Sequence, residues 1–383
     1  MSGMEDPLAW WDELGPAKTV YLSEPGVDLR AVVAIDNVAC GPSIGGVRMA
    51  TDATAHEAVR LARAMTLKNA AAGLPHGGGK SVILADAKAS PDQKEARVRA
   101  FACAIRELTD YIPGPDMGTD EACMGWIHDE IGRAVGLPRE IGGIPLDELG
   151  ATGFGLAACA EVAQEFAGFE LSGARVAVQG FGNVGRHVAR FLAERGALLV
   201  AASDSQGTIA EPGGLDVGEL IAVKAAGGSV LDAGGGERGA IDAVIDVECD
   251  IWIPSARPDV IHEDNVDRLQ ARLVLQGANI PITPGAETIL HERGVLNLPD
   301  FVANAGGVIC ASVEYAGGSP SQAFETIEEK IKANTRSVLE GSKATGATPR
   351  HVAVGLAEGR IRRAAGLRRF RAGRPEGGFA LDL

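Results

Sequence analysis

The feature that most constrains this 383-residue chain is a short strand-like stretch followed by a glycine-rich turn and a helix. Arg175–Gln179 leads directly into GFGNVG at 180–185, and RHVARFLAERGA continues as a helical pattern. Gly180 permits a tight turn, Gly182 lets the backbone approach a pyrophosphate, and Gly185 lets helix and strand pack closely. The pattern predicts a Rossmann-type dinucleotide site. The turn is completed by Phe181, Asn183 and Val184.

An acidic residue at the end of the next strand bears on the choice of coenzyme. Asp204 ends the stretch LLVAASD, where a carboxylate is expected to hold the adenosine ribose. Its charge would repel a 2′-phosphate and so favours NAD, whereas Ser203 and Ser205 beside it would tolerate NADP. No arginine follows immediately to attract the phosphate. The sequence therefore predicts NAD, with NADP as the alternative.

Strand-like and helical stretches alternate on both sides of this unit and predict an α/β protein. Before it, Ala31–Ile35 and Ser81–Leu84 are strand-like, whereas 54–72 and 92–110 are helical in pattern. After it, IDAVIDVECDIWIPSA, ARLVLQGAN and VLNLPDFVANAGGVI alternate with helical stretches, which is typical of a parallel, doubly wound sheet.

The length of the chain and the positions of its glycines and prolines predict two domains followed by a helical C-terminal segment. Glycines and a proline in GIPLDELGATGFG mark a boundary near residue 148. We expect one α/β domain at 1–148, the dinucleotide-binding domain at 149–330, and a charged helical segment at 331–383.

Composition excludes several other classes of protein. The net charge of −15 argues against general nucleic-acid binding, which needs a basic surface. The six cysteines are far apart without metal-ligand spacing, so we expect reduced thiols, no disulfide and no metal site. The acidic start has no signal-peptide pattern and no long apolar run follows, so we expect a cytoplasmic protein without membrane contact.

The stretch GLPHGGGKS at 73–81 ends like a phosphate-binding P-loop. A P-loop needs a glycine five positions before the glycine of its Gly-Lys-Ser, and that position is Leu74. An Ala-rich helical run, and not a strand, precedes it. These two departures exclude a P-loop nucleotide triphosphatase, so Lys80 needs another explanation.

Three ionisable residues of the first domain could form a catalytic group. Lys68 lies in a helical run, and Lys80 follows a glycine-rich turn expected at 77–79. If Lys68 and Lys80 converge, each lowers the pKa of the other, so that one acts as a base while the other holds a carboxylate. Asp116, in a turn after Gly114-Pro115, could carry protons. From residue types alone, surface charges are the simpler interpretation of all three.

Seven motifs, taken in their order along the chain, resemble those of the glutamate/leucine/phenylalanine/valine dehydrogenase family. This resemblance favours a catalytic group over surface charges. The resemblance extends from about residue 20 to 340. The motifs are Met65–Ala70, Gly77–Lys80, Pro115–Thr119, Gly150–Gly155, Gln179–Gly185, Gly277–Asn279 and Asn304–Gly307.

The resemblance implies an NAD(P)-dependent amino acid dehydrogenase with a cleft between a substrate and oligomerisation domain and a Rossmann domain. Lys68 would bind the substrate α-carboxylate, Lys80 would activate water or amine, and Asp116 would shuttle protons. Thr152 and Asn279 would hold the nicotinamide ribose and ring. The substrate would be surrounded by Ile44, Gly45, Met65, Gly114, Asn304 and Ala311. The 331–383 segment would pack back toward the first domain, and the chain would form dimers and larger rings of dimers.

Two positions of the expected side-chain pocket favour an apolar substrate. Similar glutamate dehydrogenases place a lysine where this chain has Ile44, and a serine where it has Ala311. A γ-carboxylate buried without those partners is costly. We therefore expect a leucine-, valine- or phenylalanine-type amino acid. The alternatives are a divergent glutamate dehydrogenase, with Ser312 or His76 as polar contacts, and a non-catalytic dinucleotide sensor.

Overall fold

The computed structural model describes residues 10–367, and residues 1–9 and 368–383 of the first and last predicted segments lie outside this range. The described chain forms two compact units: unit 1 comprises 10–145, 311–320 and 356–367, and unit 2 comprises 146–310 and 321–355. Both units are therefore discontinuous, unlike the segments 1–148, 149–330 and 331–383 expected from sequence. Long-range bonds explain the return to unit 1, since Glu314 accepts from Gly136 N and Arg360 donates to Ala70 O.

Unit 1 is built on a five-stranded mixed sheet with strand order β1-β2-β4-β3-β5. The β1/β2 and β2/β4 pairs are antiparallel, whereas β3 runs parallel to both β4 and β5. The strands are β1 (Lys18–Glu24), β2 (Leu29–Asn37), β3 (Ser43–Ala50), β4 (Gly77–Leu84) and β5 (Tyr111–Pro115).

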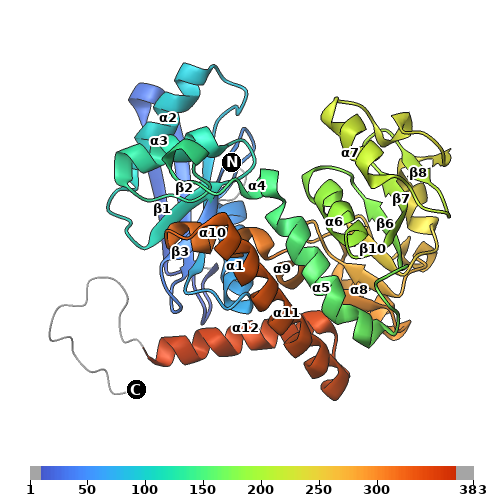
Figure 1. Ribbon diagram of the computed structural model, residues 1–383. Coiled ribbons are helices and arrows are strands. Elements are labelled where there is room, and N and C mark those ends of the chain that lie inside the picture. The colour runs from blue at the N-terminus through green and yellow to red at the C-terminus, as the bar shows by residue number, and fades with distance from the viewer. Residues whose placement is uncertain (1–9, 368–383) are drawn as a thin grey trace. The chain divides into compact units, whose positions relative to one another are not determined.

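Helices cover both faces of this sheet (Figure 1). On one face α2 and α3 form the main core with alternate strand residues such as Val33, Val47 and Ile83. On the other face α1 packs against Ala34 and Val82. The helices are α1 (Ala55–Ala71), α2 (Pro91–Ala104) and α3 (Glu121–Ile131), with short 3-10 turns η2 (Pro25–Val27) and η3 (Arg139–Ile141).

The glycines at 77–79 lie in strand β4, and the turn expected there from sequence is wrong. Gly78 sits directly under α1, where an added Cβ would lie 2.0 Å from Thr66 N. A Cβ on Gly77 would lie 1.7 Å from Asn37 O. The glycines therefore serve close packing of β4 against β2 and α1, and they place Lys80 inside a central strand.

Unit 2 contains a seven-stranded sheet of order β12-β11-β10-β6-β7-β8-β9. The strands from β12 to β7 are parallel, which confirms the predicted doubly wound arrangement, and β8 and β9 add an antiparallel edge. The strands are β6 (Arg175–Gln179), β7 (Leu198–Ser203), β8 (Thr208–Ala210), β9 (Glu237–Gly239), β10 (Ile251–Pro254), β11 (Leu273–Leu275) and β12 (Leu296–Leu298).

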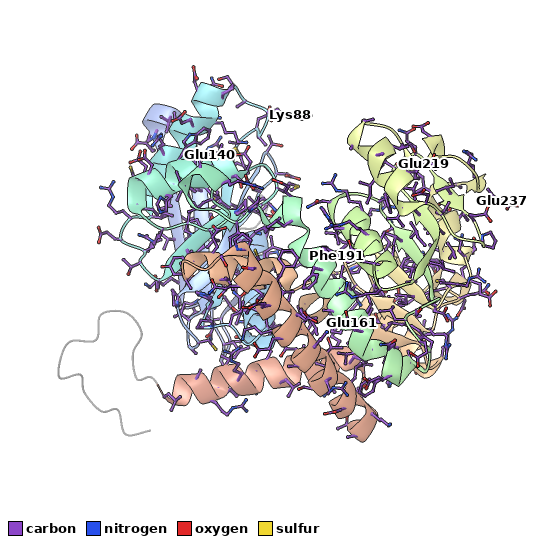
Figure 2. The ribbon with its side chains drawn as sticks, viewed as in Figure 1. Lys88, Glu140, Glu161, Phe191, Glu219 and Glu237 are labelled. Atoms are coloured by element: carbon purple, nitrogen blue, oxygen red, sulfur yellow. The ribbon has the colours of Figure 1, made fainter. Side chains whose placement is uncertain are left out.

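Helices α5 and α11 are joined in unit 2 by aromatic and ionic contacts. Phe154 of α5 lies edge-on to Phe191 of α6 and to Phe324 of α11, and Lys332 of α11 bonds Glu161 of α5 at 2.5 Å. Phe191 and Glu161 are labelled in Figure 2. The helices of unit 2 and the two that continue into unit 1 are α4 (Leu146–Leu149), α5 (Ala151–Ala167), α6 (Asn183–Ala193), α7 (Val217–Ala225), α8 (Pro284–Glu292), α9 (Asp300–Ala303), α10 (Gly306–Tyr315), α11 (Pro320–Thr345) and α12 (Pro349–Gly366); the 3-10 turns are η4 (Val230–Asp232), η5 (Ile241–Asp246) and η6 (Val266–Arg268).

Three stretches differ from the sequence prediction for identifiable reasons. IDAVID forms the 3-10 helix η5, because a short apolar run is compatible with both a buried strand and a helical turn. The GGVI part of NAGGVI belongs to α10, where Gly306 lets the helix approach α5. The helix expected at 92–110 ends at Ala104, before the turn into β5.

No described helix is long and apolar enough to cross a membrane. Within residues 10–367 the cysteines form no disulfide, and no group of three His, Cys, Asp or Glu side chains gathers as a metal site.

The close contact of β4 with α1 predicts that Gly78→Ala is destabilising. Overpacking of this kind costs ~1–3 kcal/mol, so the melting temperature should fall by several degrees. The control is Gly355→Ala, because Gly355 lies in exposed α12 with no atom within 4 Å of an added Cβ. That variant should be neutral or slightly stabilising. Equal melting temperatures for both variants would contradict the packing account.

Candidate active site

Strand alternation places the charged residues of unit 1 on the sheet face covered by α1. Along β4, Ser81 and Ile83 point into the α2/α3 side, since Ser81 bonds Tyr111 and Ile83 joins the main core. Lys80 therefore points to the α1 side. By the same alternation, Arg48 of β3 points to the α1 side because Val47 and Met49 are in the main core.

These side chains meet Asp116 at the end of β5. Lys80 Nζ lies 2.5 Å from Asp116 Oδ2, and Arg48 Nε donates to the same oxygen at 3.1 Å. Arg48 Nη1 also pairs with Glu57 in the first turn of α1. A turn fixes the backbone of Asp116, whose N–H donates to Thr119 Oγ1 at 3.0 Å. The structure thus brings the two predicted catalytic residues into direct contact.

Two glycines of β3 allow this approach. A Cβ on Gly46 would lie 2.7 Å from Asp116 Cβ and 3.1 Å from Lys80 Nζ. A Cβ on Gly45 would lie 1.6 Å from Gly79 O, and Gly45 O accepts from Tyr111 Oη at 2.9 Å. Gly45 therefore serves strand packing, and Gly46 is the residue that borders the charged pair.

Burial and the neighbouring charges together set the pKa values of the pair. Burial lowers the pKa of Lys80, and although the Asp116 carboxylate opposes this effect, the net pKa stays below its ordinary value. The pKa of Asp116 is lowered because Lys80 and Arg48 outweigh the opposing effect of burial. A lysine with a lowered pKa next to a carboxylate can exchange a proton with water or an amine more readily than an ordinary lysine.

Helix α1 carries Lys68 and Met65, one turn apart and both half-buried. Asn69 anchors this end of α1 to β4 by donating from Nδ2 to Gly77 O at 2.6 Å. Sequence reasoning attributed a depressed lysine pKa to the neighbouring lysine. In the structure burial has the largest effect on the pKa of Lys80, Asp116 opposes it, and Arg48 is the cation that lowers the pKa further.

The predicted pocket residues Ile44 and Ala311 lie in one buried apolar cluster with Ile112 and Val135. Ile44 pairs with Ile112 across β3 and β5, on the sheet face that also bears the charged pair. Gly114 borders the cluster, because a Cβ there would lie 3.0 Å from Val135 Cγ2.

A buried carboxylate holds the walls of the cluster together. Glu314, one turn after Ala311 on α10, accepts hydrogen bonds from the backbone N–H groups of Gly136, Leu137 and Ile144 at 2.7, 3.1 and 2.7 Å. These bonds connect α10 to the loop that follows Val135. Burial nevertheless raises the pKa of Glu314.

The glycine turn of unit 2 has the predicted geometry. Gly180 has a φ of +91°, and a Cβ on Gly185 would lie 2.1 Å from Gly180 O. Gly182 faces open space. The turn follows β6, which lies between β10 and β7 where the strand order reverses, the usual place for a dinucleotide in such sheets.

A cavity of about 790 Å³ adjoins this turn and fits a dinucleotide. The buried Gln179 Oε1 is an acceptor without a hydrogen-bond partner among the described residues, and Arg257 supplies a cation at the rim. Ser255 closes the turn by donating to Gln179 O and Gly180 O. The cavity is lined by Gln179, Gly180, Phe181, Gly182, Asn183, Val184, Ser203, Asp204, Ser205, Lys224, Ile241, Ser255, Ala256 and Arg257.

The contacts of Asp204 differ from the ribose-binding role expected from sequence. Its carboxylate accepts from Lys224 Nζ at 2.8 Å, Ser229 Oγ at 3.0 Å, and the backbone N–H groups of Val230 and Gln206, both at 2.9 Å. These bonds outweigh burial and lower the pKa of Asp204 to about 2. A ribose hydroxyl would have to displace one of these donors, and Lys224 offsets the charge that argued against NADP.

Other predicted coenzyme residues take defined places in unit 2. Ser203 is buried, and its carbonyl accepts from Phe181 N at 2.7 Å, so it supports the turn. Asn304 Nδ2 donates to Asn279 Oδ1 at 3.1 Å, and its own Oδ1 is buried without a partner among residues 10–367. Thr152 is the second residue of α5, and a Cβ on Gly307 would lie 3.2 Å from Thr152 Oγ1.

Sequence reasoning missed several residues that build these sites. Arg48 follows the glycine pair Gly45-Gly46 without a signal of its own, and Glu57 has no local signal beyond its place in a helix start. Glu314 and Ser255 act through contacts distant in sequence. The expected exclusion of a P-loop agrees with the strand at 77–84, because an extended strand does not form the N–H cradle that a phosphate needs.

Comparisons with known proteins show the family of the chain. The model described as "Glutamate/Leucine/Phenylalanine/Valine dehydrogenase" matches residues 142–368, and "Glu/Leu/Phe/Val dehydrogenase, dimerisation domain" matches 24–133. A glutamate dehydrogenase of Aeropyrum pernix is 39% identical over 322 residues, which are 79% of this chain and 77% of the relative.

Two solved structures extend the comparison. The hetero-hexameric glutamate dehydrogenase of Thermus thermophilus, in a Leu-bound form, has a TM-score of 0.83 and 31% identity, covering 93% of this chain and 91% of that one. The L-tryptophan dehydrogenase of Nostoc punctiforme has a TM-score of 0.72 and 26% identity, covering 92% and 97%. The chain belongs to the glutamate/leucine/phenylalanine/valine dehydrogenase family of NAD(P)-dependent amino acid dehydrogenases.

Proposed function

We propose that this protein catalyses the reversible oxidative deamination of an apolar L-amino acid to its 2-oxo acid and ammonia, with NAD or NADP as coenzyme. The observation that carries the proposal is the buried cluster of Ile44, Ile112, Val135 and Ala311 on the sheet face that bears Lys80 and Asp116. Apolar walls next to a proton-exchanging pair suit a substrate with a reactive amine and an apolar side chain.

The chemistry assigned to unit 1 is proton transfer. A bound nicotinamide coenzyme would supply the acceptor for the hydride of the α-carbon, and the oxidised substrate would be an imine. Lys80, whose pKa burial lowers, takes a proton from the water that adds to the imine carbon. Asp116, 2.5 Å from Lys80, carries protons to the departing ammonia. Lys68 on α1 is proposed to hold the substrate α-carboxylate, and Asn304 to orient the reacting groups through its unpaired Oδ1.

Glutamate is the second candidate substrate, favoured by the glutamate dehydrogenase names of the relatives. The cluster argues against it, because a γ-carboxylate among Ile44, Val135 and Ala311 would lose its water without gaining a cation. Such burial costs several kcal/mol even after relaxation, and each 1.4 kcal/mol corresponds to about tenfold in affinity. We therefore propose a preference for apolar over acidic side chains of at least ~100-fold.

An oligomeric assembly is also proposed. The support is the match of residues 24–133 to a dimerisation domain and the hexameric state printed for the Thermus thermophilus structure. A non-catalytic dinucleotide sensor is less consistent with the chain, because a sensor has no need for a buried Lys80–Asp116 pair whose assembly costs desolvation.

The proposal is tested by turnover of a panel of amino acids. Purified protein is mixed with NAD or NADP and L-Leu, L-Val, L-Ile, L-Met, L-Phe, L-Trp or L-Glu at mildly alkaline pH, and reduced nicotinamide is followed by absorbance. We expect the highest kcat/KM with an apolar amino acid and at least ~100-fold less with L-Glu. Dominant activity with L-Glu would contradict the substrate proposal, and silence across the panel would support the sensor.

The charge of the side-chain pocket predicts the effect of Ile44→Lys. A cation in the cluster should lower kcat/KM for the best apolar substrate by tenfold or more and raise it for L-Glu, because the γ-carboxylate gains a partner. The matched control is Ile44→Met, which has a similar length without charge and should keep the apolar preference. Melting curves check that both variants fold. An unchanged L-Leu to L-Glu ratio in a folded Ile44→Lys variant would show that Ile44 does not line the pocket.

A further inference from the structure

One carboxylate oxygen in unit 1 serves two cations. Asp116 Oδ2 lies 2.5 Å from Lys80 Nζ and 3.1 Å from Arg48 Nε. Arg48 is in turn paired through Nη1 with Glu57. Four charged side chains from β4, the end of β5, β3 and α1 therefore form one continuous row, Lys80–Asp116–Arg48–Glu57.

The place of Arg48 in this row is tightly fixed. Its strand position is opposite Val82 of β4, and alternation directs it to the α1 face. The planar guanidinium uses one N–H for Asp116 and another for Glu57, so its plane cannot rotate without breaking a bond. Glu57 is held at the helix start, where its backbone N–H donates to the N-cap Thr54 Oγ1 at 3.1 Å.

We propose that Arg48, oriented by Glu57, is a positioning residue that holds the Asp116 carboxylate against Lys80 for proton exchange. Arg48 acts through Asp116 and does not itself react. The inference rests on the proposed function, because the roles of Lys80 and Asp116 come from it. It goes beyond that function by assigning a role to Arg48 on β3 and Glu57 on α1, which take no direct part in the proposed reaction.

The charged side chains of the row shift the pKa of Lys80 in opposite directions. After burial, which lowers its pKa, the charged groups that act on Lys80 are Asp116 and Glu57, which raise the pKa, and Arg48, which lowers it. Removing the charge of Arg48 should therefore raise the pKa of Lys80. Removing the charge of Glu57 should lower it. A purely structural role predicts no such opposition.

The test measures kcat and kcat/KM against pH with the amino acid that the wild-type enzyme oxidises fastest. In Arg48→Gln the limb of kcat/KM that rises as Lys80 loses its proton should move to higher pH, and in Glu57→Gln to lower pH. We expect kcat of Arg48→Gln to fall by about tenfold with little change in KM, since a misplaced proton carrier slows chemistry more than binding. Arg48→Lys should restore the position of the limb but not kcat, because it keeps the charge and loses the planar fork.

The control is Arg30→Gln on β2, since Arg30 is exposed and its nearest carboxylate, on Asp28, is 3.7 Å away. This variant should match the wild-type pH profile. The proposal would be overturned if the rising limb of kcat/KM against pH moved in the same direction in Arg48→Gln and Glu57→Gln. It would also be overturned if Arg48→Gln left both the pH profile and kcat unchanged.

A second readout separates this inference from the proposed function. The rate at which Lys80 is acetylated by acetic anhydride, followed by peptide mass spectrometry across pH, reports its pKa without turnover. Opposite shifts in Arg48→Gln and Glu57→Gln support the row even if no amino acid of the panel is oxidised, in which case the proposed function alone fails. If the wild-type enzyme is active and neither the labelling nor the pH limb moves, the positioning proposal alone fails.

Discussion

The contact on which the site of unit 1 depends is the ion pair between Lys80 and Asp116. Charges that lose water in a protein interior cost several kcal/mol each, and only close pairing and further hydrogen bonds offset that cost. The surrounding sheet supplies those bonds: Arg48 adds a second cation, Thr119 accepts from the backbone of Asp116, and Gly46 leaves the room that a larger residue would fill. Local sequence features that look unrelated, a glycine pair and a helix start, thus serve one electrostatic requirement.

The same sheet face separates two kinds of environment within a few residues. Ile44 of β3 and Ile112 of β5 belong to the apolar cluster. Two positions further along the chain stand Gly46 and Gly114. Two positions beyond these glycines stand Arg48 and Asp116, which form an ion pair. Strand alternation allows this arrangement, because every second side chain of each strand faces the same side of the sheet. Polar chemistry and apolar recognition are therefore neighbours in the proposed substrate site.

How far the sequence predicts this molecule depends on whether a feature is local. The turn at 180–185 and the strand before it were predicted with the correct boundaries because their glycines respond to contacts within one strand–turn–helix unit. Gly77–Gly79 were mistaken for a turn, since the tight packing of β4 against α1 that excludes side chains there is not visible in local sequence. Asp204 was assigned to the ribose because its partners Lys224 and Ser229 lie 20 and 25 positions further on. Arg48 and Glu57 could not be identified from the sequence, because the ion pairs that link them to Asp116 form only where the fold brings β3, β5 and α1 together.

The most direct test of the central claim, an apolar side-chain pocket beside a buried proton-exchanging pair, is equilibrium binding. The complex of the enzyme with reduced coenzyme is titrated by calorimetry with L-leucine and with L-glutamate at several temperatures. The account predicts that L-leucine binds with a negative heat-capacity change, as expected when apolar surface is buried, and that L-glutamate binds at least ~100-fold more weakly. Binding of L-glutamate as tight as that of L-leucine would contradict it.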